Sequence, residues 1–240
     1  MHRRMSLHGV FNQSYEFFLM KALQYENMNY YVKIETEGDI MTTIYFMRHS
    51  EALKYNNINN TDSLQVQNEK WPLTENGESL AKEKSKLEEL QSFDMVFSSK
   101  YVRAIETAKY FTLNTINIDE RFGERKFGIN NWDELPLDFS ERQFKDFDYK
   151  IGNGESINEV IKREEAALND ILKNYEGKKI LIVGHSTALA ALFSKWCKIN
   201  YTGPYTYNDK ELFDGKWNYC ETFKLVFDDN NNLISMNNVK

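Results

Sequence analysis

Arg48, His49, Arg103 and His185 carry guanidinium and imidazole groups, which are side-chain types that bind phosphate. Guanidinium groups suit the paired hydrogen bonds that phosphoryl oxygens accept. Each of the four residues follows shortly after a run that is typical of a β-strand, where that strand leads into a helix. A lone arginine or histidine in such a place is usually structural. Four of them at three equivalent junctions indicate one common phosphate pocket.

The three strands are predicted at residues 43–47, 94–97 and 179–183. The last run has no polar alternation, which is typical of a central parallel strand that is covered on both faces. In an open parallel sheet, ligands bind at the carboxyl ends of the strands, where helix N-termini add amide donors. The order of strands and helices predicts an α/β fold with three layers (α/β/α), in which a mostly parallel sheet carries helices on both faces.

The helices around these strands have recognisable start and stop signals. Ser99 is predicted to cap a helix over residues 100–111, and Ser156 with Glu159 has the form of a capping box before a long amphipathic helix that Gly177 can end. Further predictions are a helix opening at Leu73-Thr74 with Leu80, Leu87 and Leu90 on one face, a helix over residues 187–198, and a terminal hairpin of residues 222–226 and 233–236.

Residues 1–40 differ in pattern from residues 41–240, and the chain is predicted to divide there. The spacing of apolar residues predicts one helix face, and two interpretations remain open: a helical appendage, or a leader upstream of Met41. The residues of that face are Tyr15, Phe18, Leu19, Ala22 and Leu23.

The composition excludes several classes of protein. The formal net charge of −6 argues against a general nucleic-acid surface, which normally has a basic excess. No run approaches the roughly 20 apolar residues of a membrane span. Cys197 and Cys220 have no metal-ligand spacing and are predicted to be buried or half-buried thiols in a reducing cytoplasm.

A metal or nucleotide site is not indicated. Only His49 and His185 lie in the α/β region, since His2 and His8 precede it, and no HxxxH or His-x-Asp spacing supplies further ligands. The GxxxxGK[ST] and GxGxxG motifs are absent. The sequence therefore predicts no metal and no cofactor.

From Met41 to Lys240 the chain resembles the histidine phosphatase superfamily, in its phosphoglycerate mutase-like branch. Each motif alone is weak, but six in the same order form a specific signal. The matching residues are Arg48-His49, Leu73-Thr74 with Gly77 and Ala81, Ser98-Ser99 with Arg103-Ala104 and Thr107-Ala108, Glu124 to Gly128, Gly154-Glu155-Ser156 with Arg163, and Val183-Gly184-His185.

The resemblance implies a role for each site residue. His49 would be the nucleophile that forms a phosphohistidine, with its other ring nitrogen donating to a fixed acceptor such as a backbone carbonyl. Arg48 and Arg103 would bind the phosphoryl oxygens, and His185 would be a further donor to them. Glu124 would be the general acid and later the base for the attacking water.

The sequence also departs from the family pattern. Ser50 stands where the family has Gly after the nucleophile, and its hydroxyl is predicted to add a donor to the bound phosphate. Ser186 likewise replaces a usual Gly after the second histidine. Tyr55 occupies the place of a frequent Asn, for which the neighbouring Asn56 or Asn57 could substitute.

Hydrolysis of a small phosphomonoester is the favoured activity. Two alternatives remain: phosphoglycerate mutase-type transfer, and a protein that binds a phosphorylated ligand without turnover. The segment between Glu124 and Gly154 is predicted in part to cover the crevice, with core packing an equal alternative for each of its aromatic residues, Trp132, Phe139, Phe144, Phe147 and Tyr149. The physiological substrate and the oligomeric state are not predicted.

Overall fold

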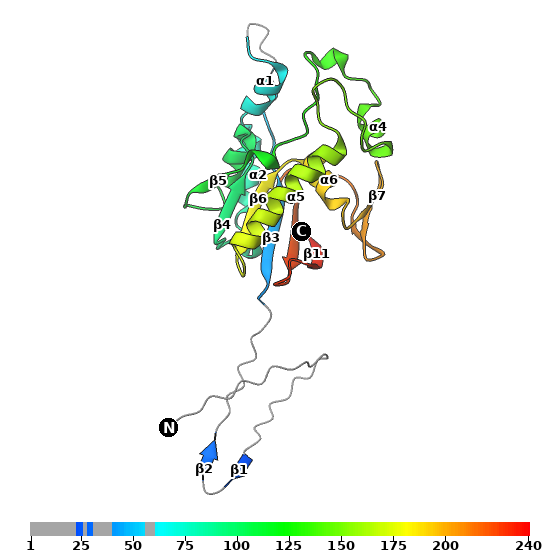
Figure 1. The fold of residues 1–240 in the computed structure, drawn as a ribbon. Coiled ribbons are helices and arrows are strands. Elements are labelled where there is room, and N and C mark those ends of the chain that lie inside the picture. The colour runs from blue at the N-terminus through cyan, green and yellow to red at the C-terminus, as the bar shows by residue number, and fades with distance from the viewer. Residues whose placement is uncertain (1–22, 26–27, 31–39, 56–60) are drawn as a thin grey trace. The chain divides into compact units, whose positions relative to one another are not determined.

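The structure, a computed structural model, describes residues 23–25, 28–30, 40–55 and 61–240 (Figure 1). The chain forms two compact units, Met1–Gly38 and Asp39–Lys240. In the first, β1 (Leu23–Tyr25) pairs antiparallel with β2 (Met28–Tyr30). Leu23 is therefore in a strand, and its predicted place on a helix face is wrong, because its backbone pairs with that of Tyr30. The rest of that face, residues 15–22, lies outside the described residues.

A six-stranded sheet forms the centre of the second unit, in the order β11-β10-β3-β6-β4-β5. The four strands from β3 to β5 are parallel, and the β10–β11 hairpin adds to the β3 edge in antiparallel orientation. The predicted mostly parallel sheet and terminal hairpin are confirmed. The strands are β3 (Thr42–Arg48), β4 (Met95–Ser98), β5 (Ile116–Ile118), β6 (Lys179–Gly184), β10 (Thr222–Phe227) and β11 (Leu233–Val239).

Alternate residues of the central strands face two different hydrophobic clusters. Ile44 and Phe46 of β3 face the layer that contains α5 (Ile157–Asn174) and α6 (Ser186–Phe193). Tyr45 and Met47 face the opposite layer, which contains α2 (Glu75–Lys84) and α3 (Val102–Ala108). A strand buried on both faces explains why the run reads as continuously apolar. The predicted three-layer α/β/α fold is confirmed.

The remaining elements lie in the connections. A three-stranded sheet of β7 (Lys198–Ile199), β8 (Tyr205–Tyr207) and β9 (Lys210–Phe213) follows α6. The helix predicted to reach residue 198 ends at Phe193, and Lys198 already belongs to β7. The short helices are α1 (Leu64–Lys70), α4 (Phe139–Lys145) and the 3-10 turns η1 (Glu88–Leu90), η2 (Glu120–Phe122) and η3 (Trp132–Glu134).

The face of α2 differs from the prediction. Leu80 and Leu87 are exposed, and Leu87 lies beyond the end of the helix. The helix buries Gly77 and Ala81 instead, because it approaches the loop after β3 closely. A Cβ atom on Gly77 would lie only 2.2 Å from the carbonyl oxygen of Glu51, so a larger residue does not fit there.

Helix starts follow the sequence signals in one case and not in another. The capping box of Ser156 and Glu159 at the start of α5 is confirmed. Ser99 does not cap α3; Tyr101 holds the N-cap position without a side-chain hydrogen bond. The Ser99 hydroxyl accepts from the amide of Tyr101 at 3.4 Å and makes its shorter hydrogen bond with Nε2 of His185 at 2.8 Å, a partner 86 positions away in sequence.

Helix α5 also buries a carboxyl group. Glu164 is fully buried, and neither of its carboxylate oxygens has a hydrogen-bond partner among the described residues. The Nη1 atom of Arg163 lies 3.9 Å from one of them. Burial raises the pKa of Glu164 to about 8, so this side chain is a neutral acid at pH 7.

This buried acid predicts a pH-dependent stability. Between its ordinary pKa of 4.5 and about 8, the folded state binds a proton that the unfolded state has lost. The free energy of unfolding therefore falls as pH rises through that window, at roughly 1.4 kcal/mol per pH unit. Glu164→Gln keeps the neutral shape, so it should flatten this dependence and raise the Tm relative to wild type above pH 8. Thermal unfolding across the pH range measures it.

The neighbour Glu165, whose side chain is 40% exposed, provides the control for this prediction. Glu165 forms a surface ion pair with Lys195, and such pairs contribute little to stability. Glu165→Gln should leave the pH dependence between pH 5 and pH 9 as it is in wild type. If Glu164→Gln gives the same pH dependence as wild type, Glu164 is not a neutral acid in the folded protein.

Candidate active site

The strand ends bring the distant junctions together. Arg48, the last residue of β3, pairs in register with Gly184, the last residue of β6. The amide of His49 then donates to the carbonyl of Gly184 at 2.9 Å, and the amide of Ser99 donates to the carbonyl of Val183 at 3.1 Å. The three junctions, after β3, β4 and β6, therefore meet at the carboxyl edge of the sheet.

The His49 ring has one anchored nitrogen and one nitrogen that faces a cation. Its Nδ1 lies 2.6 Å from the carbonyl oxygen of Ser50, which confirms the expected contact with a backbone carbonyl. Since a carbonyl only accepts, Nδ1 carries the proton and Nε2 carries the lone pair. Nε2 accepts a hydrogen bond from Nε of Arg103 at 3.1 Å. Burial and the positive charge of Arg103 hold the pKa of His49 well below its usual value, so the ring is neutral.

Arg103 joins the two histidines. Its Nη2 lies 3.3 Å from Nδ1 of His185, and the two imidazole centroids are 5.0 Å apart. The guanidinium is buried, its Nη1 donates to the carbonyl of Asn68 at 2.5 Å, and it lies over the ring of Tyr101 at 4.6 Å. A side chain held by this many contacts has little freedom to move. It is therefore preorganised as a donor at this edge of the sheet.

The proton of His185 is placed by its two partners. A guanidinium can only donate, so Nδ1 of His185 is the acceptor facing Arg103. The proton of the neutral ring is then on Nε2, where it donates to the Ser99 hydroxyl. Burial and Arg103 hold the pKa of His185 well below its usual value. Because a hydroxyl can also donate, Ser99 is able to serve either tautomer of this ring.

Arg48 completes the group from the end of β3. Its Nη1 donates to the carbonyl of Trp217, and its guanidinium lies 4.7 Å from the centre of the Tyr219 ring. Its buried Nε has no hydrogen-bond partner among the described residues. The structure therefore brings Arg48, His49, Arg103 and His185 to one place, as the sequence predicts.

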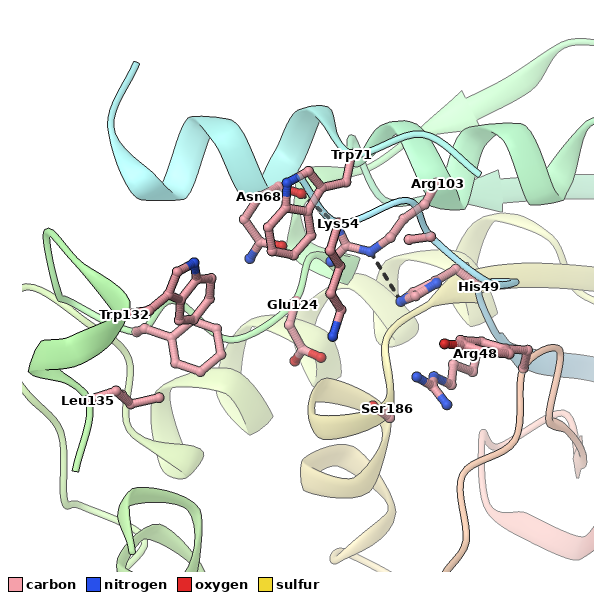
Figure 2. A pocket seen from close by; sticks show the side chains of 13 residues that line it. Arg48, His49, Lys54, Asn68, Trp71, Arg103, Glu124, Trp132, Leu135 and Ser186 are labelled. Carbon is pink, nitrogen blue, oxygen red and sulfur yellow. Dashed lines mark hydrogen bonds between the residues drawn. The ribbon is translucent and has the colours of Figure 1, made fainter. Parts of the chain in front are cut away.

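A cavity of about 530 Å³ opens in front of these residues, and Glu124 lines it together with Arg48, His49 and Arg103 (Figure 2). Two backbone amides hold the Glu124 carboxylate: Arg125 donates at 2.8 Å, and Thr187, near the start of α6, donates at 3.4 Å. In Figure 2 this carboxylate lies between the arginine side of the cavity and Trp132. His185 lies behind Arg103 and is fully buried.

The segment that carries Glu124 is tied to α5 by another of the matched motifs. Arg163 donates to both carboxylate oxygens of Glu155, at 2.8 and 3.1 Å, and the amide of Lys126 donates to the same carboxylate. Gly128 follows with a φ of +74°, and a Cβ atom there would meet the carbonyl of Ile151 at 2.0 Å. These residues position Glu124 and do not line the cavity themselves.

The departures from the motifs have different outcomes. Ser50 is fully buried, its hydroxyl donates to the carbonyl of Gly77 at 2.6 Å, and it does not line the cavity. Its single hydroxyl proton is therefore used in holding α2, and we do not assign Ser50 a contact with phosphate. Ser186 does line the cavity, at the start of α6. Asn56 and Asn57 lie outside the described residues.

Several lining residues are given no role in the sequence analysis. They come from the loop after β3, from α1 and the residue after it, from the segment that follows Glu124 and from the loop before β10. Of the aromatic residues of the covering segment, Trp132 lines the cavity, whereas Phe139 is buried and packs against Phe127 and Tyr149. The additional lining residues are Ala52, Lys54, Asn68, Trp71, Phe127, Leu135 and Tyr219.

Residues 44–233 match the sequence profile of the histidine phosphatase superfamily (branch 1), which covers most of the α/β unit. The chain belongs to the histidine phosphatase superfamily. The resemblance expected for residues 41–240 is thereby confirmed. Among the described residues, no three His, Cys, Asp or Glu side chains are grouped so that they could hold a metal ion.

The chain is similar to a protein and to a solved structure from two Bacillus species. Over 128 residues the chain is 30% identical to the "uncharacterized phosphatase PhoE" of Bacillus subtilis (strain 168), a match that covers 52% of this chain and 64% of that protein. The structure of YhfR from Bacillus stearothermophilus is 26% identical with a TM-score of 0.58, covering 80% of this chain and 94% of that one.

A more distant structure supports the fold alone. Mycobacterial glucosyl-3-phosphoglycerate phosphatase is 17% identical, with a TM-score of 0.59 over 78% of this chain and 91% of that one.

Both cysteines of this chain are buried and unpaired, as predicted. Within the described part of the chain, no helix has the length and apolar character needed to cross a bilayer.

Proposed function

We propose that this histidine phosphatase superfamily member hydrolyses phosphomonoesters through a phosphohistidine on His49. The observation that carries the proposal is the state of the His49 ring. It is neutral, its Nδ1 proton is held by Ser50, and its Nε2 lone pair lies on the side of Arg103, which lines the cavity. An imidazole fixed in this tautomer is a ready nucleophile.

The reaction has two steps. The lone pair of Nε2 attacks phosphorus, an N–P bond forms, the P–O bond to the alcohol breaks, and Glu124 gives its proton to the departing oxygen. A water molecule then gives a proton to Glu124 and attacks the phosphohistidine, which releases phosphate and the neutral imidazole. Each step returns the proton that the other one used, so the cycle is balanced.

The two arginines bind the phosphoryl oxygens during both steps. Arg103 already donates toward both imidazoles, and Arg48 has an unpartnered Nε beside the cavity. A phosphoryl oxygen that takes the acceptor place of Nε2 on Arg103 frees that lone pair for attack. Donors fixed before the reaction stabilise the charge that collects on these oxygens without reorganisation.

For His185 to donate to the same oxygens, its proton has to move to Nδ1 and the guanidinium of Arg103, which faces that atom in the free protein, has to turn toward the phosphoryl group. Ser99 makes this possible, because its hydroxyl can turn from accepting at Nε2 to donating there. Ser99 is thus a positioning residue that holds the His185 ring in either tautomer, whereas Arg103 sets the tautomer in the free protein. The name of the PhoE relative, a phosphatase, agrees with the proposed activity.

Chemical trapping tests the proposal. The purified chain is mixed with a ³²P-labelled phosphomonoester without added metal, quenched in base and digested. The expected result is a base-stable, acid-labile label on the peptide that contains His49. Turnover without label on this peptide would contradict the mechanism. Adding a bisphosphoglycerate primer in parallel with a phosphoglycerate substrate separates hydrolysis from mutase transfer, because only a mutase depends on it.

Ser99→Ala tests whether this hydroxyl supports His185 during the reaction. Removing one buried hydrogen-bond partner of the ring should lower kcat by about tenfold, which corresponds to about 1.4 kcal/mol. The ¹⁵N chemical shifts of His185 should still show the proton on Nε2 in the free variant, because Arg103 continues to face Nδ1. A kcat equal to that of wild type would show that Ser99 is not needed for the proton to move to Nδ1.

A further inference from the structure

The cavity has two ends of different chemistry. Arg48, His49 and Arg103 line one end, and Trp132 with Leu135 lines the other (Figure 2). Its volume of about 530 Å³ falls in the range of cavities that enclose drug-sized molecules, roughly 300–1,000 Å³. A phosphoryl group therefore occupies only the arginine end. The other end is left for the alcohol part of the substrate.

The second end is apolar and largely aromatic. The indoles of Trp71 and Trp132 are stacked with centroids 6.1 Å apart and 25° between their planes. Phe127 meets Trp132 edge to face at 5.2 Å, and Leu135 follows Trp132 by three residues on the same short turn. The three rings and one isobutyl group form an apolar wall, which we call the Trp71–Trp132 wall.

Contacts with residues outside the cavity fix the side chains of the Trp71–Trp132 wall. Arg125 is buried, its guanidinium lies 4.9 Å from the Phe127 ring centre and 4.8 Å from that of Phe139, and it donates to Gln143 of α4. The indole N–H of Trp71 donates to the carbonyl of Tyr55 at 3.0 Å. With this donor used, the part of Trp71 that lines the cavity is apolar, and the Arg103 guanidinium lies 5.9 Å from its ring centroid. A wall fixed in this way binds a flat apolar group with little loss of conformational entropy.

The charges near the wall do not favour a second anionic group at that end. Asp133 and Glu134 are exposed neighbours of Trp132 on the same turn. Lys54 is the lining cation besides the two arginines in the described part of the cavity, and in Figure 2 its amine points toward Glu124, near the reacting end. A carboxylate or second phosphate would gain a partner only close to phosphorus.

We infer that the preferred substrates are monoesters whose alcohol carries a planar aromatic group, which stacks on the Trp71–Trp132 wall while its phosphate binds the arginines. This inference rests on the proposed function for turnover, but the affinity that it predicts does not depend on catalysis. Burial of a two-ring group against such a wall should improve binding by about 10- to 100-fold.

The test compares ligands that differ only at the remote group. Hydrolysis is measured with 2-(1-naphthyl)ethyl phosphate and with ethyl phosphate, whose leaving alcohols are both unactivated. Binding is measured by calorimetry with the corresponding phosphonates, which cannot be hydrolysed. We expect both kcat/KM and affinity to favour the naphthylethyl ligand by about 10- to 100-fold. The kcat/KM for phosphoserine should be similar to that for ethyl phosphate.

Variants of the segment between Glu124 and Gly154 test which side chains cause the preference for the naphthylethyl ligand. Trp132→Ala should reduce the preference for the naphthylethyl ligand by about tenfold or more, as for removal of a well-packed aromatic contact. Leu135→Ala should reduce it by a few fold. The matched control is Leu137→Ala, because Leu137 is 108% exposed and does not line the cavity. This control should keep the wild-type preference.

The outcomes separate the two claims. If the esters are hydrolysed but neither kcat/KM nor phosphonate affinity favours the naphthylethyl group, the inference is wrong and the proposed function stands. If no ester is hydrolysed but the affinity preference is present and is lost in Trp132→Ala, the proposed function fails and the inference stands. A preference that Trp132→Ala leaves intact, or one for phosphoserine, also overturns the inference.

Discussion

Replacing His49 by alanine is expected to lower kcat on a phosphomonoester by about 10⁴-fold or more, as for removal of a nucleophile from a preorganised site. Nε2 is the atom that would bond to phosphorus, and no other described nitrogen with a free lone pair lies in the same place. His185 cannot replace it, because its Nδ1 accepts from Arg103 and the ring lies outside the cavity lining.

The fold should survive this substitution. His49 follows β3, and the backbone bond from its amide to Gly184 does not involve its side chain. Thermal unfolding of His49→Ala should therefore stay cooperative, and the affinity for inorganic phosphate should stay within about tenfold of wild type, since both arginines remain. Steady-state kinetics with the variant, with calorimetry of phosphate binding, makes the measurement. Residual activity near the wild-type level would falsify the phosphohistidine mechanism.

The sequence predicts the arginine end of the cavity well for a physical reason. Strands buried on both faces appear as apolar runs, and the ends of parallel strands meet at one edge whatever their separation in the chain. Arg48, His49, Arg103 and His185 could therefore be placed together from local patterns alone. The backbone carbonyl that fixes the His49 tautomer is also local, since it belongs to the next residue.

The hydrogen-bond partners of the side-chain hydroxyl groups could not be predicted from local patterns. Ser99 precedes a helix and satisfies the usual rule for an N-cap, yet it bonds to His185, which another strand brings within reach. Ser50 follows the nucleophile, yet its hydroxyl donates to Gly77 of α2. Hydroxyl groups can bond to nearby backbone groups, but the packed layers bring shorter-range partners from distant segments, at 2.6 Å for Ser50 and 2.8 Å for Ser99.

The other end of the cavity is less accessible to prediction. Asn68 lies in α1 and Trp71 directly follows that helix, whereas Trp132 comes from the 3-10 turn η3. Their convergence depends on loop geometry, which has no periodicity in the sequence. The sequence carries one trace of it: the segment between Glu124 and Gly154 is rich in aromatic residues, and one of them, Trp132, stacks on Trp71.

Replacing Glu124 by glutamine should have an effect that depends on the leaving group. The amide side chain in Glu124→Gln would keep the shape and the contacts to the amides of Arg125 and Thr187 but has no acidic proton to give. With ethyl phosphate, whose alkoxide is a poor leaving group, kcat/KM should fall by about 10²- to 10⁴-fold, the usual contribution of a general acid. With p-nitrophenyl phosphate the loss should be at least about tenfold smaller, because nitrophenolate leaves without a proton.

The choice of kcat/KM confines this test to the first step. That constant reports events up to the formation of the phosphohistidine, so a slower attack of water in the variant affects kcat but not this comparison. The matched control is Glu120→Gln, four residues earlier in η2, whose side chain is 76% exposed and does not line the cavity. It should behave as wild type with both esters. Equal losses for the two esters in Glu124→Gln would mean that Glu124 binds or orients the substrate, and the proton would then have to come from another group.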